Sequence, residues 1–268
     1  MSAPTPAGVP QPAASTAPLA TGPVTYYTAG EGRPVLHLHP AGGLHWGGVH
    51  AALALTHHVF APVAPGFDGT PEHAGVDSIA GLGLLAANFI ERVVGGPCDV
   101  IGHSFGGWVA ASLAAQRPDL VGQLVLSASA GFRPPGTPQI PSDPEARKRA
   151  LFRHPEKLGP GKGAAIEAAN QQRHARYHGG MAMDAALLEK LRAFDHLTLL
   201  VHGSHDGVIP ERSSQRLRAT LPRSYLVYLW DAGHALEADQ PERTARLVGE
   251  FLQRSEAFLV NWGEADEG

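Results

Sequence analysis

The sequence predicts an α/β fold in which a mostly parallel central sheet is flanked by helices. Short apolar, β-branched runs alternate along the chain with longer Ala/Leu-rich helical patterns. Such alternation is typical of a parallel sheet built from right-handed crossovers. The strand runs are almost entirely apolar, as expected where helices cover both faces of a sheet.

The predicted elements follow from the same two periodicities, and Gly, Pro or Asp bounds each strand. The strands are expected at Val35–His39, His58–Val63, Cys98–Gly102, Gln123–Ser127, Leu197–His202 and Tyr225–Leu229. The helices are expected at Leu44–Leu55, Ser78–Val94, Phe105–Gln116, Glu211–Leu221 and Pro241–Ser255.

Domain boundaries follow shifts in composition. Residues 1–23 are rich in Pro and Ala without charge or aromatic side chains, so we expect an unstructured arm. Residues 24–130 and 197–260 form the α/β core, and residues 131–196, Pro-rich and then helical, form an inserted helical cap. The tail 261–268 is acidic and expected to fray.

Composition excludes several classes of protein. The 268 residues carry 21 basic and 25 acidic side chains, for a net charge of −4. The sequence therefore lacks the excess of positive charge that is typical of nucleic-acid-binding proteins. One cysteine, Cys98, excludes an internal disulfide framework and a cysteine-based zinc site. No apolar window is long enough to cross a membrane, and the first residues lack the pattern of a secretory signal. Lysine is scarce beside arginine, as in GC-rich genomes, so we expect a bacterial cytoplasmic protein.

The segment 102–106 reads G-H-S-F-G and fits the pattern G-x-S-x-G. A predicted strand precedes it and a predicted helix follows, so Ser104 lies on a sharp turn that exposes its hydroxyl at a helix N-terminus. Glycines are required on both sides because the strand and helix backbones approach closely. Ser104 is therefore the predicted nucleophile.

A serine hydroxyl needs an adjacent base, and a third group must orient that base. His234 follows the last predicted strand and lies at the sheet edge where ligands bind in open α/β sheets. Asp206 follows the preceding strand and is the favoured acid, because the loop after residues 123–127 holds no carboxylate. Asp231 is the alternative acid, with a solvated or turn-capping role expected instead. His103 adjoins Ser104, but neighbours on a tight turn point apart, so it is expected to pack rather than react.

Two backbone N–H groups are expected to bind the oxyanion of an acyl-transfer intermediate. One belongs to Phe105, directly after the nucleophile. The other belongs to Ala41 in the Gly-rich loop after the first predicted strand. The substrate pocket around them is expected to include His39, Gly42, Gly43, Trp46 and His103.

These motifs resemble the α/β-hydrolase fold family. The chain order Ser104, Asp206, His234 matches the family's order of nucleophile, acid and histidine. Segment 65–69 (P-G-F-D-G) resembles the family's turn after its fourth strand, and 206–210 resembles its D-x-x-x-P acid loop. The resemblance runs from about residue 24 to 257 and implies that the insertion is a lid over the nucleophile.

Two departures from the family pattern are visible. Pro40 stands where the family has Gly after its histidine, and a serine nucleophile argues against the epoxide hydrolases and haloalkane dehalogenases of this fold. Basic side chains in the insertion would favour an acidic substrate if they face the pocket, and would otherwise form its solvated face: Arg133, Lys162, Arg173 and Arg176.

The resulting hypothesis is a cofactor-free serine hydrolase acting on a small ester, lactone or related carbonyl compound. A C–C bond hydrolase or a perhydrolase on the same three residues is the alternative within enzymes. A small-molecule receptor with slow catalysis is the alternative outside them. The pairs His37-x-His39 and His202-x-x-His205 suggest a metallohydrolase, but residues 40–43, directly after the first pair, hold no Asp to complete a carboxylate-bearing metal site, so no metal is expected.

Overall fold

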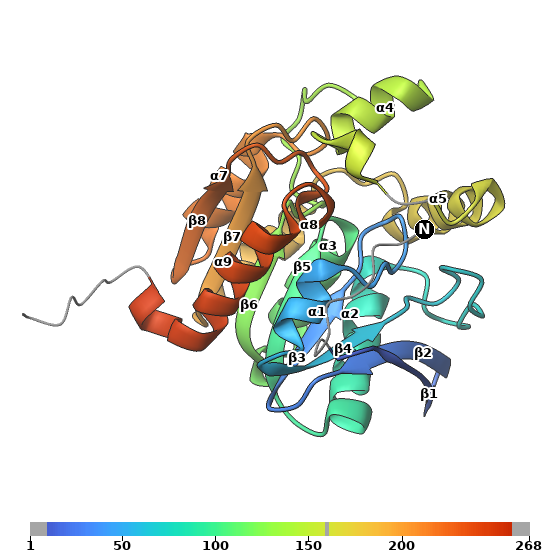
Figure 1. The fold of residues 1–268 in the computed structure, drawn as a ribbon, viewed down its shortest axis with the longest axis vertical. Helices are drawn as coiled ribbons and strands as arrows, with labels where there is room; N and C mark the ends of the chain where they lie inside the picture. Colours follow the sequence, from blue (N-terminus) through green and yellow to red (C-terminus); the bar gives the residue numbers. More distant parts are fainter. Residues whose placement is uncertain (1–9, 159–160, 259–268) are drawn as a thin grey trace, which may run out of the picture.

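The computed structural model describes residues 10–158 and 161–258, which build an eight-stranded sheet between two layers of helices (Figure 1). The strand order is β1-β2-β4-β3-β5-β6-β7-β8. The pairs β1–β2 and β2–β4 are antiparallel and the remaining pairs are parallel. The strands are β1 Ala13–Leu19, β2 Gly22–Ala29, β3 Arg33–Leu38, β4 His57–Pro62, β5 Cys98–His103, β6 Val121–Ser127, β7 Thr198–Gly203 and β8 Ser224–Leu229.

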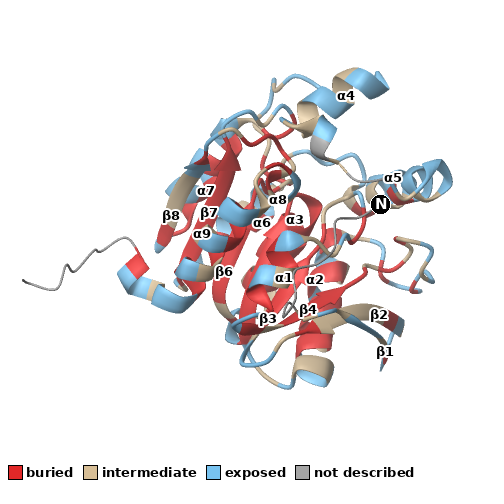
Figure 2. Ribbon diagram, in the orientation of Figure 1, coloured by how far each residue is buried: buried red, intermediate tan, exposed pale blue. Residues whose placement is uncertain are grey.

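Helices cover both faces of this sheet. One face carries α1 (Gly48–Leu53), α8 (Leu236–Asp239) and α9 (Pro241–Arg254), whose buried residues include Leu53 and Phe251. The other carries α2 (Ile79–Phe89), α3 (Phe105–Gln116) and α7 (Glu211–Thr220). Short helical segments complete the core at Ile90–Val94, Pro118–Leu120 and Ser255–Phe258. Figure 2 shows the central strands buried between these layers, so an apolar core lies on each face.

The predicted α/β class and its mostly parallel sheet are confirmed. All six predicted strands and all five predicted helices are present, with ends that differ by a few residues. The strands were recognisable because continuous apolar runs are required where both faces are covered.

The prediction of an unstructured N-terminal arm is wrong for residues 13–23. Residues 13–29 instead form the antiparallel hairpin of β1 and β2 at the edge of the sheet. Ala17 and Leu19 are buried in the core, and an edge strand tolerates Pro18 because one side of its backbone needs no partner. Composition did not indicate the strand, because only Ala17 and Leu19 of its residues are buried. Residues 1–9 of the predicted arm and the acidic tail (261–268) lie outside the described residues.

The segment 131–196, here called the insertion, connects β6 to β7. It contains α4 (Pro144–Leu151), α5 (Ala164–His178) and α6 (Ala185–Lys190), with short turns at Pro155–Lys157 and Leu191–Ala193. Figures 1 and 2 show α4 and α5 beyond the sheet edge and largely exposed. The last part differs from the expected cap, because Leu187, Leu191 and Phe194 are buried in the main core.

None of the helices among the described residues combines the length and apolar character needed to span a bilayer.

Candidate functional site

Ser104 lies on a strained turn between β5 and α3. Its backbone has φ 54° and ψ −113°, a conformation that non-glycine residues rarely adopt. A Cβ at Gly106 would lie 2.0 Å from the carbonyl oxygen of Leu38, and one at Gly102 would lie 2.4 Å from that of Gly106. The two glycines are therefore required for the turn that presents Ser104, as the sequence predicted.

The structure brings the three predicted catalytic side chains into one hydrogen-bonded chain. His234 Nε2 lies 2.8 Å from Ser104 Oγ, and His234 Nδ1 lies 3.0 Å from Asp206 Oδ2. The other oxygen of Asp206 accepts from the backbone N–H groups of Val208 and Ile209, each at 2.8 Å. With Nδ1–H donated to the carboxylate, the Nε2 lone pair faces the hydroxyl and can accept its proton.

Electrostatics keep the acid of this chain ionised. Burial would raise the pKa of Asp206, but the charge and hydrogen bond of His234 and the N–H groups of Ile209 and Val208 outweigh it and lower the pKa. Asp206 is therefore a carboxylate at neutral pH and can stabilise a positive imidazolium on His234.

Asp231, the alternative acid, is occupied elsewhere. Its carboxylate pairs with Arg153 Nε at 3.0 Å and with His154 Nε2 at 2.8 Å, and its side chain is 35% exposed. Its φ of 59° marks a tight turn, which accounts for an Asp at this position. Geometry therefore places Asp206, and not Asp231, beside the imidazole.

His103 is buried, and its side chain bonds to the backbone of the loop that carries His234. Its Nε2 lies 2.9 Å from the carbonyl oxygen of His234, to which it donates. Burial lowers the pKa of His103, so the ring is neutral. This contact agrees with a packing role.

The predicted oxyanion loop turns back on itself after β3. The N–H of Gly43 donates to the carbonyl of Pro40 at 3.0 Å, and Gly43 has the positive φ of 87° that the turn requires. Ala41 and Gly42 occupy the turn itself, with Ala41 half-buried, and Phe105 opens helix α3. Convergence of the Ala41 and Phe105 N–H groups on one oxyanion remains a prediction.

Two predicted pocket residues, His39 and Trp46, flank this loop in the sequence, and His39 bonds to it. His39 Nδ1 donates to the carbonyl of Pro40 at 2.7 Å, and its Nε2 accepts from the N–H of Ala64 at 3.0 Å. Burial lowers the pKa of His39 to about 4, so the neutral ring can fill both roles. Trp46 is half-buried and stacks on His50, with ring centroids 4.9 Å apart.

A polar cluster that sequence reasoning missed ties the insertion to the oxyanion loop. Asn170 of α5 is 1% exposed, and its Nδ2 donates to Gly42 O at 2.9 Å and to Asp68 Oδ1 at 2.8 Å. Its Oδ1 accepts the N–H of Asp68 at 2.8 Å. Asp68 Oδ2 in turn accepts from the N–H of Leu44 at 2.8 Å and from Lys162 Nζ at 2.6 Å.

Charge strengthens this cluster. Burial would raise the pKa of Asp68, but hydrogen bonds from Lys162 and Asn170 outweigh it and lower the pKa. The only signal in the sequence was an Asp in the P-G-F-D-G turn, and nothing local indicated its partner about a hundred residues away.

Replacing Asn170 with alanine is expected to lower kcat by up to ~10²-fold, because a shift of the oxyanion loop of about 1 Å has effects of that order. The variant leaves the carbonyl of Gly42 and the N–H of Asp68 without this partner. Steady-state kinetics measure the effect, with Gln172→Ala on the exposed side of the same helix as control. Equal kcat in the two folded variants would contradict a role for the cluster.

The histidines that suggested a metallohydrolase form hydrogen bonds to other side chains of the protein. His37 Nε2 lies 2.9 Å from Glu237 Oε1, and His202 Nδ1 lies 2.9 Å from Ser214 Oγ. In the part of the chain that the structure describes, no three His, Cys, Asp or Glu side chains are arranged to hold a metal ion.

Buried neutral histidines predict a loss of stability in acid. Burial lowers the pKa of His39 to about 4 and that of His50 to about 3, against about 6.5 in the unfolded chain. Between these pKa values the unfolded chain binds protons that the folded chain does not bind. The free energy of unfolding is therefore highest above about pH 6.5 and falls as the pH approaches 4. Each histidine contributes a slope of ~1.4 kcal/mol per pH unit in this window.

Urea unfolding at several pH values between about 7 and 4.5 tests this slope. His50→Gln cannot titrate there and keeps an acceptor for the N–H of Gly47, so its stability should fall less steeply with pH. An unchanged slope in this variant would contradict the assignment to His50.

Comparisons with known proteins show similarity to hydrolases. A family model described as the alpha/beta hydrolase family matches residues 35–247. A 2-hydroxymuconate semialdehyde hydrolase from Pseudomonas sp. (strain CF600) is 29% identical, over 88% of this chain and 92% of its own. A protein of the same name from Pseudomonas putida is 30% identical, over 85% of this chain and 90% of its own. The crystal structure of a serine hydrolase from Cycloclasticus zankles superposes with a TM-score of 0.76 and 17% identity, covering 91% of this chain and 99% of that one.

Proposed function

Because the chain belongs to the alpha/beta hydrolase family and is a hydrolase, we propose that it cleaves a small carbonyl substrate through an acyl-enzyme on Ser104. The proposal rests on the continuous hydrogen-bonded chain of Ser104, His234 and Asp206, here called the relay. Its two hydrogen bonds, from Ser104 Oγ to His234 Nε2 and from His234 Nδ1 to Asp206 Oδ2, are 2.8 and 3.0 Å long. The resemblance drawn from the sequence motifs is confirmed at the level of the family.

In the proposed mechanism, Ser104 Oγ attacks the carbonyl carbon while His234 Nε2 takes the hydroxyl proton. Asp206 stabilises the imidazolium, and the N–H groups of Ala41 and Phe105 bind the oxyanion. The bond to the leaving group breaks, and His234 returns the proton to it. Water, deprotonated by His234, then attacks the acyl-enzyme and releases the acid and Ser104.

The substrate class has two candidates. Esters or lactones need only this relay, since their leaving group is an oxygen that accepts the proton from His234. The names of the two Pseudomonas relatives favour a C–C bond beside a ketone or aldehyde, with carbon as the protonated leaving atom. We therefore propose that a 2-hydroxy-6-oxodienoate is the better substrate.

One basic residue of the insertion supports an acidic substrate. Lys162 pairs with Asp68, while Arg173 and Arg176 pair with Glu72. The Arg133 guanidinium donates to the carbonyl oxygen of Pro138 within the insertion; burial lowers its pKa, and the negative charge of Asp206 opposes this shift. We propose that Arg133 attracts the substrate carboxylate and that residues 131–184 act as the lid of the pocket.

Labelling with a fluorophosphonate, with the adduct located by mass spectrometry, tests the nucleophile. Absence of an adduct on Ser104 would contradict the mechanism. A panel of p-nitrophenyl esters, lactones and dienoates then ranks substrates by kcat/KM, and turnover of none of them would favour a small-molecule receptor.

Arg133→Gln is expected to raise KM about tenfold for the dienoate and to leave KM for a neutral ester unchanged, because the glutamine amide keeps an N–H donor for the carbonyl of Pro138 and loses the charge that attracts the carboxylate. Michaelis constants for the two substrates measure this split. Equal effects on both substrates would refute recognition of the carboxylate by Arg133.

A further inference from the structure

The C-terminal end of α4 and the three residues after it, together residues 150–154 of the insertion, lie against both loops that carry the relay. Gly207 and Ala235 directly follow the acid and the base of the relay. Gly207 N–H donates to the carbonyl of Ala150 at 3.1 Å, and Ala235 N–H donates to that of Leu151 at 2.9 Å. The insertion is therefore bonded through its backbone to the two loops whose spacing sets the relay.

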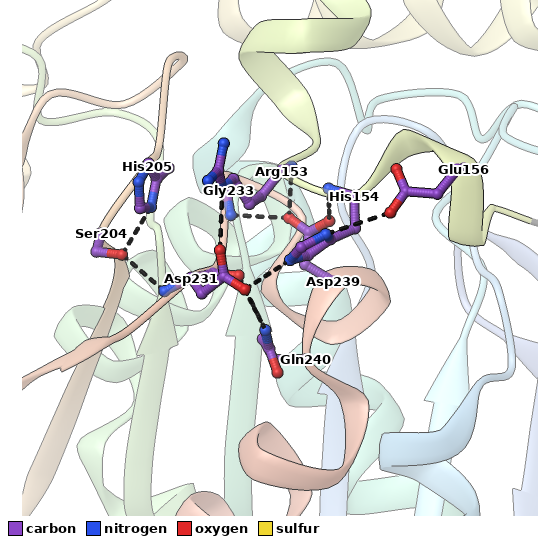
Figure 3. Close-up of polar contacts among 9 residues, drawn as sticks. All are labelled: Arg153, His154, Glu156, Ser204, His205, Asp231, Gly233, Asp239 and Gln240. Carbon is purple, nitrogen blue, oxygen red and sulfur yellow. Dashed lines mark hydrogen bonds and ion pairs between the residues drawn. The ribbon is translucent and has the colours of Figure 1, made fainter.

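Asp239, the last residue of α8, joins the same stretch to the loop of the base. It is 1% exposed, and its Oδ2 accepts the N–H of Gly233 at 2.8 Å and that of Arg153 at 2.9 Å. Its Oδ1 accepts the N–H of His154 at 2.8 Å. Figure 3 shows this carboxylate between the two segments. A carboxylate that accepts three N–H groups makes stronger bonds than a neutral acceptor would.

The two segments are in direct contact at Gly233. A Cβ at Gly233 would lie 2.9 Å from the N atom of Arg153 and 2.9 Å from the carbonyl oxygen of Leu151. Gly233 immediately precedes the base of the relay, so any change in this contact is passed to the imidazole through one peptide unit.

A second, outer layer joins the same residues through their side chains. Asp231 accepts from Arg153 Nε at 3.0 Å and from His154 Nε2 at 2.8 Å, and its backbone carbonyl accepts from Gln240 Nε2 at 2.9 Å (Figure 3). The side chains of Asp231 and Arg153 are 35% and 48% exposed. Exposed ion pairs contribute little to rigidity, whereas the buried contacts of Asp239 have no water to replace them.

We propose that Asp239 is a positioning residue that fixes the imidazole of His234 between Ser104 and Asp206, and that residues 150–154 of the insertion form part of this support. The inference rests on the proposed function of the relay. It implies that displacement of the insertion disturbs the base itself, so the insertion affects the chemical step as well as access to the pocket.

Asp239→Asn tests the proposal. The single amide oxygen of asparagine can accept the N–H groups of Gly233 and Arg153 in place of the carboxylate Oδ2, but its NH₂ group then faces the N–H of His154. We expect kcat to fall about 10- to 100-fold with KM changed less than about threefold, because the imidazole is misplaced and not the substrate. The same variant should shift the pH profile of kcat/KM and weaken the downfield ¹H NMR signal of the His234 Nδ1 proton.

Asp231→Asn is the matched control. It keeps a residue that tolerates the positive φ at this position, removes the outer charge pairs and leaves Asp239 in place. Its kcat should stay within about twofold of the wild type. A folded Asp239→Asn variant with wild-type kcat and pH profile would overturn the proposal, as would equal losses in the two variants.

Gly233→Ala provides an independent test if Asp239→Asn does not fold. It keeps the carboxylate and inserts a methyl group between the two segments, and it should lower kcat with little change in KM. Unchanged kcat in folded Gly233→Ala would overturn the proposal. Labelling of the wild type at Ser104 separates the outcomes: no labelling rejects the proposed function, whereas labelling with insensitive variants rejects only the role of Asp239.

Discussion

Replacing Ser104 with alanine is expected to lower kcat by ~10⁴–10⁶-fold, because no acyl-enzyme can form without the hydroxyl. The remaining turnover would come from substrate binding and from the N–H groups that stabilise the oxyanion. Ser104 is buried at 7% exposure, and the removed Oγ is hydrogen-bonded to His234 at 2.8 Å, so the change is confined to the relay.

Steady-state kinetics with the best substrate of the panel measure this loss, and a fluorophosphonate should no longer label the variant. The same φ of 54° is strained for alanine as for serine, so thermal stability should change little. Turnover near that of the wild type would reject Ser104 as the nucleophile.

Replacing Asp206 with asparagine is expected to lower kcat by ~10⁴-fold while the protein stays folded. The asparagine carbonyl can still accept from Val208 and Ile209, which turns its NH₂ group toward His234 Nδ1. The imidazole must then accept at Nδ1 and carry its proton on Nε2, where it can no longer take the proton of Ser104.

Kinetics of Asp206→Asn beside Asp231→Asn discriminate the two acids that the sequence left open. Only the variant at 206 should lose activity, because the carboxylate at 231 contacts Arg153 and His154 instead of His234. A large loss in Asp231→Asn with an active Asp206→Asn would reverse the assignment.

The nucleophile turn was predictable because its constraints are local. The pattern G-x-S-x-G between an apolar run and a helical pattern specifies a strand, a tight turn and a helix within about twenty residues. In the structure, close backbone approach at Gly102 and Gly106 requires glycine, so residue type and geometry agree.

The N-terminal hairpin was not predictable from composition. Residues 13–19 contain small and polar side chains, and their order depends on pairing with β2 and on burying Ala17 and Leu19. Such an edge strand is stabilised by its neighbours more than by its own propensity.

The buried polar side chains that bond the insertion to the loops of the site were also not predicted from the sequence. Asp68 and Asn170 are 102 residues apart, and Arg153 and Asp239 are 86 apart, so no window of sequence contains both partners. What identifies these residues is that a polar side chain is buried and hydrogen-bonded. That burial arises only when the insertion packs against the core, so the sequence does not show it.

By itself, the sequence determined the α/β class, the parallel strands, the turn at Ser104 and the chain order of nucleophile, acid and histidine. Periodicity and backbone sterics act over a few residues, so a short window of sequence is enough to recognise them. The tertiary structure decided that Asp206 and not Asp231 meets His234, and that Asp68 and Asp239 tie the insertion to the loops of the site. Those contacts depend on where distant loops converge, because a carboxylate bonds to whichever N–H groups the fold brings within about 3 Å of it.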